Sequence, residues 1–274
     1  MTRNMTEYHR PQRIEDAVSL LSRPNVRTVT IGGGSRLIAE GRRDVEAVVD
    51  LRDLNLNYIQ RNGDALRIGA TTTLQAMIDS PESAQAWGGE LARVVGLTAA
   101  RTLREQGTLA GTLVSAESSN PLAVLLLALG ASMTIVGSEN KILPLDEFYA
   151  ARVSLHHVSL IREIAIPLPR SGDAAAFEKV SRTPADQPIV CAAVKAKSES
   201  GALREVRVAL GGVGSKPQRL PKIEHALETQ SFESAVQRIA EEIDPPSDFL
   251  GSAEYRREMA VVLVRRAARQ LLKP

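Results

Sequence analysis

A run of three glycines followed by a serine is the segment of this chain best suited to hold an anion. It comprises Gly32, Gly33, Gly34 and Ser35 and follows an apolar segment. Glycine has no Cβ, so its backbone can lie close to a ligand with successive N–H groups turned inward, and the serine hydroxyl would add a donor. The run lacks the third glycine of the dinucleotide fingerprint, because Leu37 stands there. It therefore predicts either a phosphate-binding loop outside the Rossmann class or a tight turn without a ligand.

A second cluster of small residues and threonines lies between Arg101 and Thr112. It ends in Gly-Thr-Leu-Ala-Gly-Thr, from Gly107 onward. A dinucleotide has a pyrophosphate that needs N–H donors and a sugar chain that needs hydroxyl partners, so two such loops could hold one long ligand. A pair of ordinary tight turns is the alternative.

Composition excludes several classes of function. The 274 residues carry 34 basic and 32 acidic side chains, and the basic ones are dispersed, which argues against a nucleic-acid partner. The single cysteine, Cys191, excludes cysteine-ligated clusters and disulfides within this chain, and its apolar surroundings predict a small buried side chain. His156 and His157 lack further candidate ligands, so no metal site and no catalytic residue is predicted. The absence of a signal sequence or long apolar helix predicts a cytoplasmic protein with no membrane span.

Strand and helix signals alternate in the first part of the chain and predict an α+β or α/β region. Asn120, Pro121 and Gly130 frame an apolar run that predicts a buried helix with a side-chain cap at its start. The other expected elements here are strands over 26–31, 45–51, 66–70, 131–136 and 160–166, and helices over 14–21 and 74–78.

The segment 167–173, with two prolines and a glycine, is the best candidate for a domain boundary. Beyond it, strands are expected over 175–180, 189–197 and 203–210, which suits an antiparallel meander. Helices over 232–243 and 253–272 would close the chain. On the last helix, Arg256, Arg257, Arg265 and Arg266 are expected to form a solvated face, or a docking surface for a partner.

Five blocks give the chain a family resemblance that extends over nearly its whole length. It resembles the medium, FAD-binding subunit of molybdenum hydroxylases, the family that includes carbon monoxide dehydrogenase and xanthine dehydrogenase. The last block belongs to the C-terminal domain of these subunits and not to flavin enzymes in general. The blocks are residues 31–35, 66–73, 107–112 leading into 129–131, 177–179 with Arg182, and 251–257.

The resemblance implies an α+β fold with a two-lobed FAD-binding domain of the PCMH type over residues 1–170. A smaller α+β domain, an antiparallel sheet with helices, would follow over 174–274. It also implies FAD as cofactor, with Leu160 near the flavin ring and Lys179 reaching the flavin from the C-terminal domain. The remaining cofactor-binding residues that it implies are Ile31, Gly32, Gly33, Gly34, Ser35, Thr108, Gly111 and Thr112.

In such complexes a molybdenum-cofactor large subunit oxidises substrate and a 2Fe-2S small subunit passes electrons to the flavin, which delivers them to a final acceptor. The resemblance therefore implies these two partners, and it allows heterotrimers of this kind to pair as dimers. The single cysteine agrees with this division, because this chain cannot hold the clusters itself.

Five positions depart from the family pattern, and two of them, Val158 and Ser159, stand for the usual Gly-Glu ahead of Leu160. The second motif usually reads Thr-Ile-Gly-Gly-Asn, but Ala110 and Thr112 stand here for a glycine and the asparagine, and Pro121 stands for an aspartate. Losing one charge-assisted hydrogen bond costs about 1.5 to 3 kcal/mol, or roughly one to two decades in affinity, so weakened FAD binding is expected. Two alternatives stay open: a stand-alone FAD-dependent reductase of the enolpyruvyl-glucosamine reductase type, and a flavin-free structural subunit of the same complex.

Overall fold

The computed structural model describes residues 5–137, 139–151, 159–199 and 201–272. Contacts divide the chain into two compact units that do not follow chain order. Two early segments pack with the C-terminal third, so the units are considered one at a time below. The first unit comprises Met1–Glu82, Ala99–Ser115 and Ser132–Ile166, and the second comprises Ser83–Thr98, Ala116–Ala131 and Pro167–Pro274.

The first unit begins with a small parallel sheet of order β1-β3-β2. Parallel neighbours need crossover connections, which the short helices α1 and α2 provide. The central strand β3 is buried along its whole length, and its register pairs Ile31 with Asp50. The glycine run therefore leaves this sheet at the carboxyl end of β2. The elements are β1 (Glu7–His9), α1 (Ile14–Leu21), β2 (Thr28–Ile31), α2 (Ser35–Glu40) and β3 (Ala47–Asp50).

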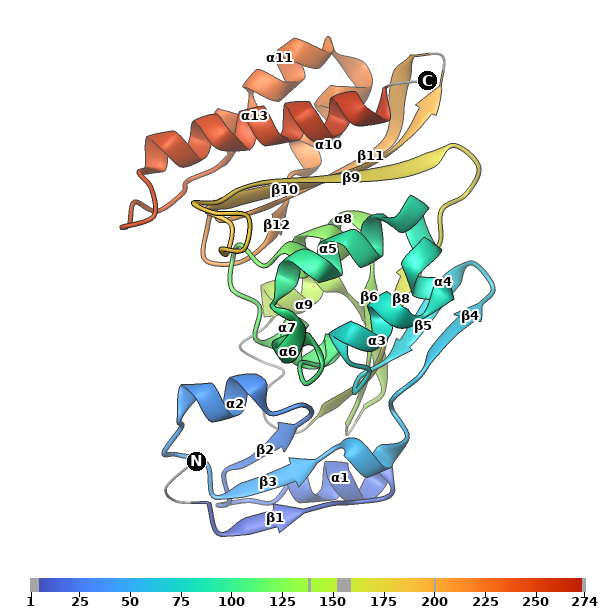
Figure 1. Cartoon of the computed structure of the whole chain (residues 1–274), viewed down its shortest axis with the longest axis vertical. Helices are drawn as coiled ribbons and strands as arrows, with labels where there is room; N and C mark the ends of the chain where they lie inside the picture. The colour runs from blue at the N-terminus through green and yellow to red at the C-terminus, as the bar shows by residue number, and fades with distance from the viewer. Residues whose placement is uncertain (1–4, 138, 152–158, 200, 273–274) are drawn as a thin grey trace. The chain divides into compact units, whose positions relative to one another are not determined.

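A second sheet of the same unit has the order β4-β5-β8-β6-β7. Its strands β4 and β5 form an antiparallel pair, and β6 pairs antiparallel with both β7 and β8. Short helices connect and cover it (Figure 1). The elements are η1 (Arg52–Leu54), β4 (Ile59–Asn62), β5 (Ala65–Gly69), α3 (Leu74–Asp79), α6 (Arg101–Arg104), α7 (Leu109–Val114), β6 (Ser132–Val136), β7 (Lys141–Pro144), α9 (Leu145–Ala151) and β8 (Leu160–Pro167).

A buried carboxylate ties three strands of this second sheet together. Glu163 on β8 pairs with Arg67 on β5 and accepts a hydrogen bond of 3.5 Å from the Thr134 hydroxyl on β6. It also accepts a hydrogen bond of 2.7 Å from the hydroxyl of Tyr58, which precedes β4. Burial raises the pKa of Glu163, but the hydrogen bonds from Tyr58 and Arg67 outweigh it, so the pKa lies below its ordinary value. Burial, and then the bond to Glu163, raises the pKa of Tyr58 to about 12.

We expect Glu163→Gln to lower the free energy of unfolding by about 2 kcal/mol at pH 7, because Arg67 loses its charged partner. A lowered carboxyl pKa stabilises the fold above the ordinary value of 4.5 and loses that effect as pH falls through the lowered value. Urea denaturation followed by circular dichroism between pH 3 and 7 measures both effects. The variant should converge on the wild type at the acid end. A gap that stays constant with pH would contradict this account.

The second unit is built on an antiparallel sheet of order β12-β11-β10-β9. Helix α13 packs along one face and α8 against the other, so β10 is buried from Val190 to Ala196. Figure 1 shows α13 running along this sheet. The elements are α4 (Pro81–Gln85), η2 (Ala86–Gly89), α5 (Glu90–Thr98), α8 (Pro121–Leu129), β9 (Asp173–Val180), β10 (Val190–Glu199), β11 (Ala202–Gly211), β12 (Gln218–Arg219), α10 (Pro221–Thr229), α11 (Phe232–Gln237), α12 (Ile239–Glu242) and α13 (Ala253–Leu271).

Helix α8 confirms the predicted capped and buried helix. The Asn120 side chain accepts a hydrogen bond of 3.0 Å from the N–H of Ala123, and Pro121 occupies the first turn. Gly130 ends the helix with a φ of 78°, and every residue between the caps is buried. The antiparallel meander is also confirmed by β9, β10 and β11, and Cys191 is fully buried within it. Burial raises the pKa of the Cys191 thiol.

Arg256 contradicts the expected solvated face on α13, because its side chain is buried with only 3% of the residue exposed. Its guanidinium donates to the backbone oxygens of Ile189 at 2.7 Å and Gly212 at 2.8 Å. It also makes two bonds, of 2.7 and 2.8 Å, to the Asp248 carboxylate. Arg256 thus joins the loop before α13 to the ends of β10 and β11. Of the other three arginines, Arg266 is exposed.

Candidate functional site

A pocket of about 770 Å³ opens in the first unit, within the range of roughly 300 to 1,000 Å³ found for cofactor sites. The glycine run and β2 line it from the small sheet, and α7, β6 and β8 line it from the larger sheet. All lining residues belong to the first unit. Of the residues predicted to bind a cofactor, it brings together Ile31, Gly32, Gly33, Gly34, Ser35, Thr108, Gly111, Thr112 and Leu160.

The glycine run offers a row of unused backbone donors to this pocket. The hydrogen bonds of the described residues include none donated by the N–H groups of Gly32, Gly33, Gly34 or Ser35. Gly34 has a φ of 75°, in the left-handed region, where a side chain would be strained. Four consecutive free N–H groups beside a pocket fit a pyrophosphate, which supplies several acceptor oxygens.

The glycines are also needed for packing between the two loops. A Cβ on Gly33 would lie 1.5 Å from the backbone oxygen of Gln106, a distance that no side chain can occupy. A Cβ on Gly32 would lie 2.9 Å from Oγ1 and 3.2 Å from Cγ2 of Thr108. The glycine run therefore rests directly on the start of the second loop. The sequence predicted two loops that could hold one ligand, and the structure shows that these two loops also contact each other directly.

The second loop uses most of its own backbone donors within the protein. The N–H of Leu109 donates to Thr72 O at 2.9 Å, and that of Ala110 donates to Ala70 O at 3.3 Å. The N–H of Gly111 donates to the Thr108 hydroxyl at 3.2 Å, which makes Thr108 the cap of α7. Ala110, which replaces a glycine of the usual motif, lines the pocket with 8% of its surface exposed. The two loops therefore differ in the donors that they leave for a ligand.

Arginines gather at the end of the pocket formed by β2 and α2. Arg42 makes two bonds, of 3.1 and 2.9 Å, to Asp44, and Arg27 pairs with the same carboxylate at 2.9 Å. The hydrogen bond from Arg42 is the main reason that the pKa of Asp44 falls to about 2. Arg36 pairs with Glu40 at 2.9 Å along α2. Of the charged residues that line the pocket, three are arginines and one, Glu40, is acidic, and this balance favours an anionic ligand.

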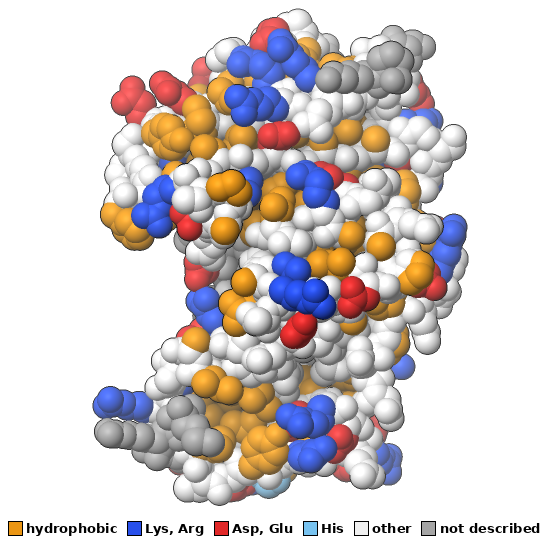
Figure 2. Space-filling model, viewed as in Figure 1, with side chains coloured by type: hydrophobic (Ala, Val, Ile, Leu, Met, Phe, Trp, Pro, Cys, Tyr) orange, Lys and Arg blue, Asp and Glu red, His pale blue; other side chains and the backbone are white. Residues whose placement is uncertain are grey.

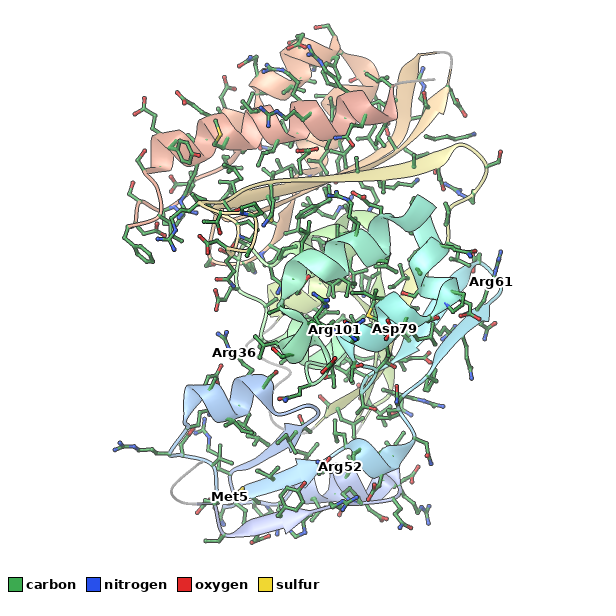
Figure 3. All side chains as sticks on the ribbon, viewed as in Figure 1. Met5, Arg36, Arg52, Arg61, Asp79 and Arg101 are labelled. Carbon is green, nitrogen blue, oxygen red and sulfur yellow. The ribbon has the colours of Figure 1, made fainter. Side chains whose placement is uncertain are left out.

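These arginines belong to a surface of mixed charge. Figure 3 shows Arg36 projecting from α2 on the side nearer to α6. Over the face shown in Figure 2, Lys and Arg side chains are interspersed with Asp and Glu.

Within the described ranges, no three or more His, Cys, Asp or Glu side chains are grouped to hold a metal ion. No described helix is both long enough and apolar enough to cross a membrane.

The lining that β6, α9 and β8 contribute to the pocket is apolar. Leu160 lies there, as the resemblance implies, and it is joined by Ile135, Phe148 and Ile161. The last three were not expected from the sequence as lining residues. The alternation of β6 could have indicated Ile135, because Thr134 and Ile135 must point to opposite faces of the sheet. Phe148 carries no comparable signal in the sequence, since α9 is short.

Lys179 lies in the second unit, where its side chain hydrogen-bonds to backbone oxygens of the same unit. Its ammonium donates to the backbone oxygens of Pro184 at 2.8 Å and Asp186 at 3.1 Å. Burial lowers the pKa of Lys179. The side chain thus braces the turn between β9 and β10. Its expected contact with the flavin stays a prediction. His156 and His157 lie outside the described residues.

Comparison with known proteins identifies the family. The model of the FAD binding domain in molybdopterin dehydrogenase matches residues 3–169, and that of the CO dehydrogenase flavoprotein C-terminal domain matches residues 175–271. The chain belongs to the family of FAD-binding medium subunits of molybdenum hydroxylases. The α+β fold with an FAD-binding domain and a C-terminal domain is confirmed, as is the oxidoreductase class of the family.

Individual relatives are similar to this chain over nearly the whole length of both proteins. The chain is 32% identical to the carbon monoxide dehydrogenase medium chain of Afipia carboxidovorans over 275 residues, covering 95% of this chain and 94% of that protein. It is also 32% identical to the uncharacterized protein YgfM of Escherichia coli (strain K12), covering 94% and 93%. The structure of reconstituted CO dehydrogenase from Oligotropha carboxidovorans superposes with a TM-score of 0.90 at 29% identity, covering 99% of both chains.

Proposed function

We propose that this FAD-binding chain takes electrons from a 2Fe-2S small subunit and passes them through FAD to a final acceptor, within a complex that also contains a molybdenum-cofactor large subunit. The relatives named above as medium chains support such a complex, as does the similarity to the nicotine 6-hydroxylase medium subunit of Paenarthrobacter nicotinovorans. When bound, FAD supplies the exchange of one or two electrons, and the protein supplies binding and orientation.

The row of free N–H groups from Gly32 to Ser35 carries this proposal. These groups would hold the pyrophosphate, and the arginines at the same end of the pocket would favour its charge. Thr108, Gly111 and Thr112 would line the opposite side, and Leu160 would exclude water from the flavin ring. We also propose that the FAD-binding domain spans residues 1–170 and the C-terminal domain 174–274, a division supported by the limits of the two family models.

The visible spectrum of the purified chain with added FAD tests the proposal. We expect flavin bands at one FAD per chain. Because a ligand that binds only the folded state stabilises it, FAD at about 100 times its Kd should raise the free energy of unfolding by about 2.7 kcal/mol. Adenosine diphosphate should raise it less. A chain that associates stably with its partner subunits but takes up no FAD would instead support the flavin-free structural subunit.

Association with the partners separates this function from that of a stand-alone reductase. The match to the C-terminal domain of CO dehydrogenase flavoproteins over residues 175–271 favours the subunit. Reduction of the bound FAD by the reduced iron–sulfur subunit, measured by stopped-flow absorbance, tests the electron transfer directly. Rapid reduction of the isolated chain by a nicotinamide nucleotide, with enolpyruvyl-glucosamine nucleotide as acceptor, would overturn it.

A further inference from the structure

We propose that the two threonines of the second loop have separate roles: Thr108 offers the cofactor only its backbone N–H and positions the glycine run, whereas Thr112 offers its hydroxyl. The inference rests on the proposed function, because it assigns different contacts with FAD to two residues of the same site. It also changes an expectation, since the resemblance implies that both threonines line the cofactor without distinguishing what each donates.

The hydroxyl of Thr108 is already engaged within the protein. It accepts the N–H of Gly111 at 3.2 Å and so caps α7. A Cβ added to Gly32 would lie only 2.9 Å from Oγ1 and 3.2 Å from Cγ2 of Thr108. The side chain therefore faces the Cα of Gly32 and the first turn of α7. In that place it acts as a spacer that sets the distance between the glycine run and the second loop.

The backbone N–H of Thr108 differs from those that follow it. An antiparallel bridge pairs Thr108 with Thr73 through the bonds Leu74 N to Gly107 O and Leu109 N to Thr72 O, both 2.9 Å. In this pattern the bridged residue itself turns its N–H away from its partner strand. The hydrogen bonds of the described residues include none donated by this N–H, whereas those of residues 109–112 are all donated to protein oxygens. Among the second-loop residues that line the pocket, Thr108 is therefore the one whose backbone N–H is free within the described residues.

Thr112 has the opposite arrangement. Its N–H donates to Thr108 O at 2.9 Å, but no described residue shares a hydrogen bond with its hydroxyl. It is half-buried and lines the pocket. It lies four residues after Thr108, so both residues occur on one side of α7. By contrast, the hydroxyl of Ser115, one residue beyond α7, donates to Gly111 O at 2.7 Å and is not free for a ligand.

Two isosteric substitutions separate the roles, because valine keeps the shape of threonine and loses only its hydroxyl. Thr108→Val and Thr112→Val are compared with the wild type by FAD titration, thermal melting and hydrogen exchange at the Gly111 amide. A matched control is Thr98→Val on α5, where the hydroxyl donates to Val94 O at 3.0 Å in the other unit. The exchange measurement needs no FAD, so it reads the cap of α7 directly.

We expect Thr108→Val to speed exchange at Gly111 at least tenfold and to lower the melting temperature, with a loss of FAD affinity of no more than about threefold. Thr112→Val should weaken FAD binding about tenfold and leave both exchange and melting near the wild-type values. A tenfold loss of affinity in Thr108→Val with unchanged exchange would overturn the division, as would unchanged affinity in Thr112→Val. If the wild type itself binds no FAD, the proposed function fails, and the division between the threonines fails with it.

Discussion

Gly33→Ala should abolish the cofactor site, with a loss of at least about 100-fold in FAD affinity, which corresponds to about 2.7 kcal/mol. The added Cβ would lie 1.5 Å from the backbone oxygen of Gln106, so one of the two loops must move. Gln106 precedes Gly107, whose oxygen accepts the N–H of Leu74 at 2.9 Å, so the second loop is fixed to the start of α3. The glycine run is the part that moves, and its row of N–H groups loses its place beside the pocket.

Gly96→Ala is the matched control for this prediction. A Cβ on Gly96 meets no atom within 4 Å, and the residue lies in α5 of the other unit. It should leave FAD affinity unchanged, because Gly96 does not line the pocket. It should not destabilise α5 either, because alanine is favoured over glycine in a helix. Fluorescence quenching of FAD measures both variants. If Gly33→Ala binds FAD as tightly as Gly96→Ala does, the contact between the loops does not determine the site.

Arg256→Met should lower the free energy of unfolding of the second unit by about 3 kcal/mol, since breaking a buried ionic and hydrogen-bonded contact costs about 3 to 5 kcal/mol. The substitution leaves the backbone oxygens of Ile189 and Gly212 without the donors that now lie at 2.7 and 2.8 Å. The single tryptophan, Trp87, is buried in the same unit, so its fluorescence in a urea titration reports this loss.

Two further variants test the cause. Arg256→Lys keeps the charge but cannot reproduce the planar set of donors, so it should recover only part of the stability. Arg266→Ala removes an exposed arginine of the same helix and should change the free energy by less than about 0.5 kcal/mol. Equal stability of Arg256→Met and Arg266→Ala would show that the buried contacts contribute little.

Local patterns predicted the elements whose structure depends on neighbouring residues. The cap, proline and closing glycine of α8 lie within ten positions of each other, and they determined its limits correctly. The three strands of the meander were also predicted from their own composition. By contrast, the expected helix over 232–243 is divided into two short helices, α11 and α12, which meet at Arg238. Propensity within a short window does not register such a break.

Contacts between distant segments were beyond prediction. Gly33 and Gln106 are far apart in the chain, and nothing in either segment indicates that backbone would touch backbone. The same holds for Arg256, which on a helix with several arginines is indistinguishable by type from its exposed neighbours. The glycine run correctly indicated where the pocket lies. Which N–H groups of the second loop are free depends on tertiary pairing with residues 70–74, which the sequence does not display.

The buried Arg256 changes how the block 251–257 should be used to classify sequences. Arg256 of this block is held by hydrogen bonds to Gly251, Ile189, Gly212 and Asp248, which all lie in the second unit. None of these hydrogen bonds involves a residue that lines the pocket of the first unit. The block is therefore a marker of subunit type and carries no information about cofactor content. Surveys of this family should accordingly judge FAD occupancy from positions 32–35 and 112.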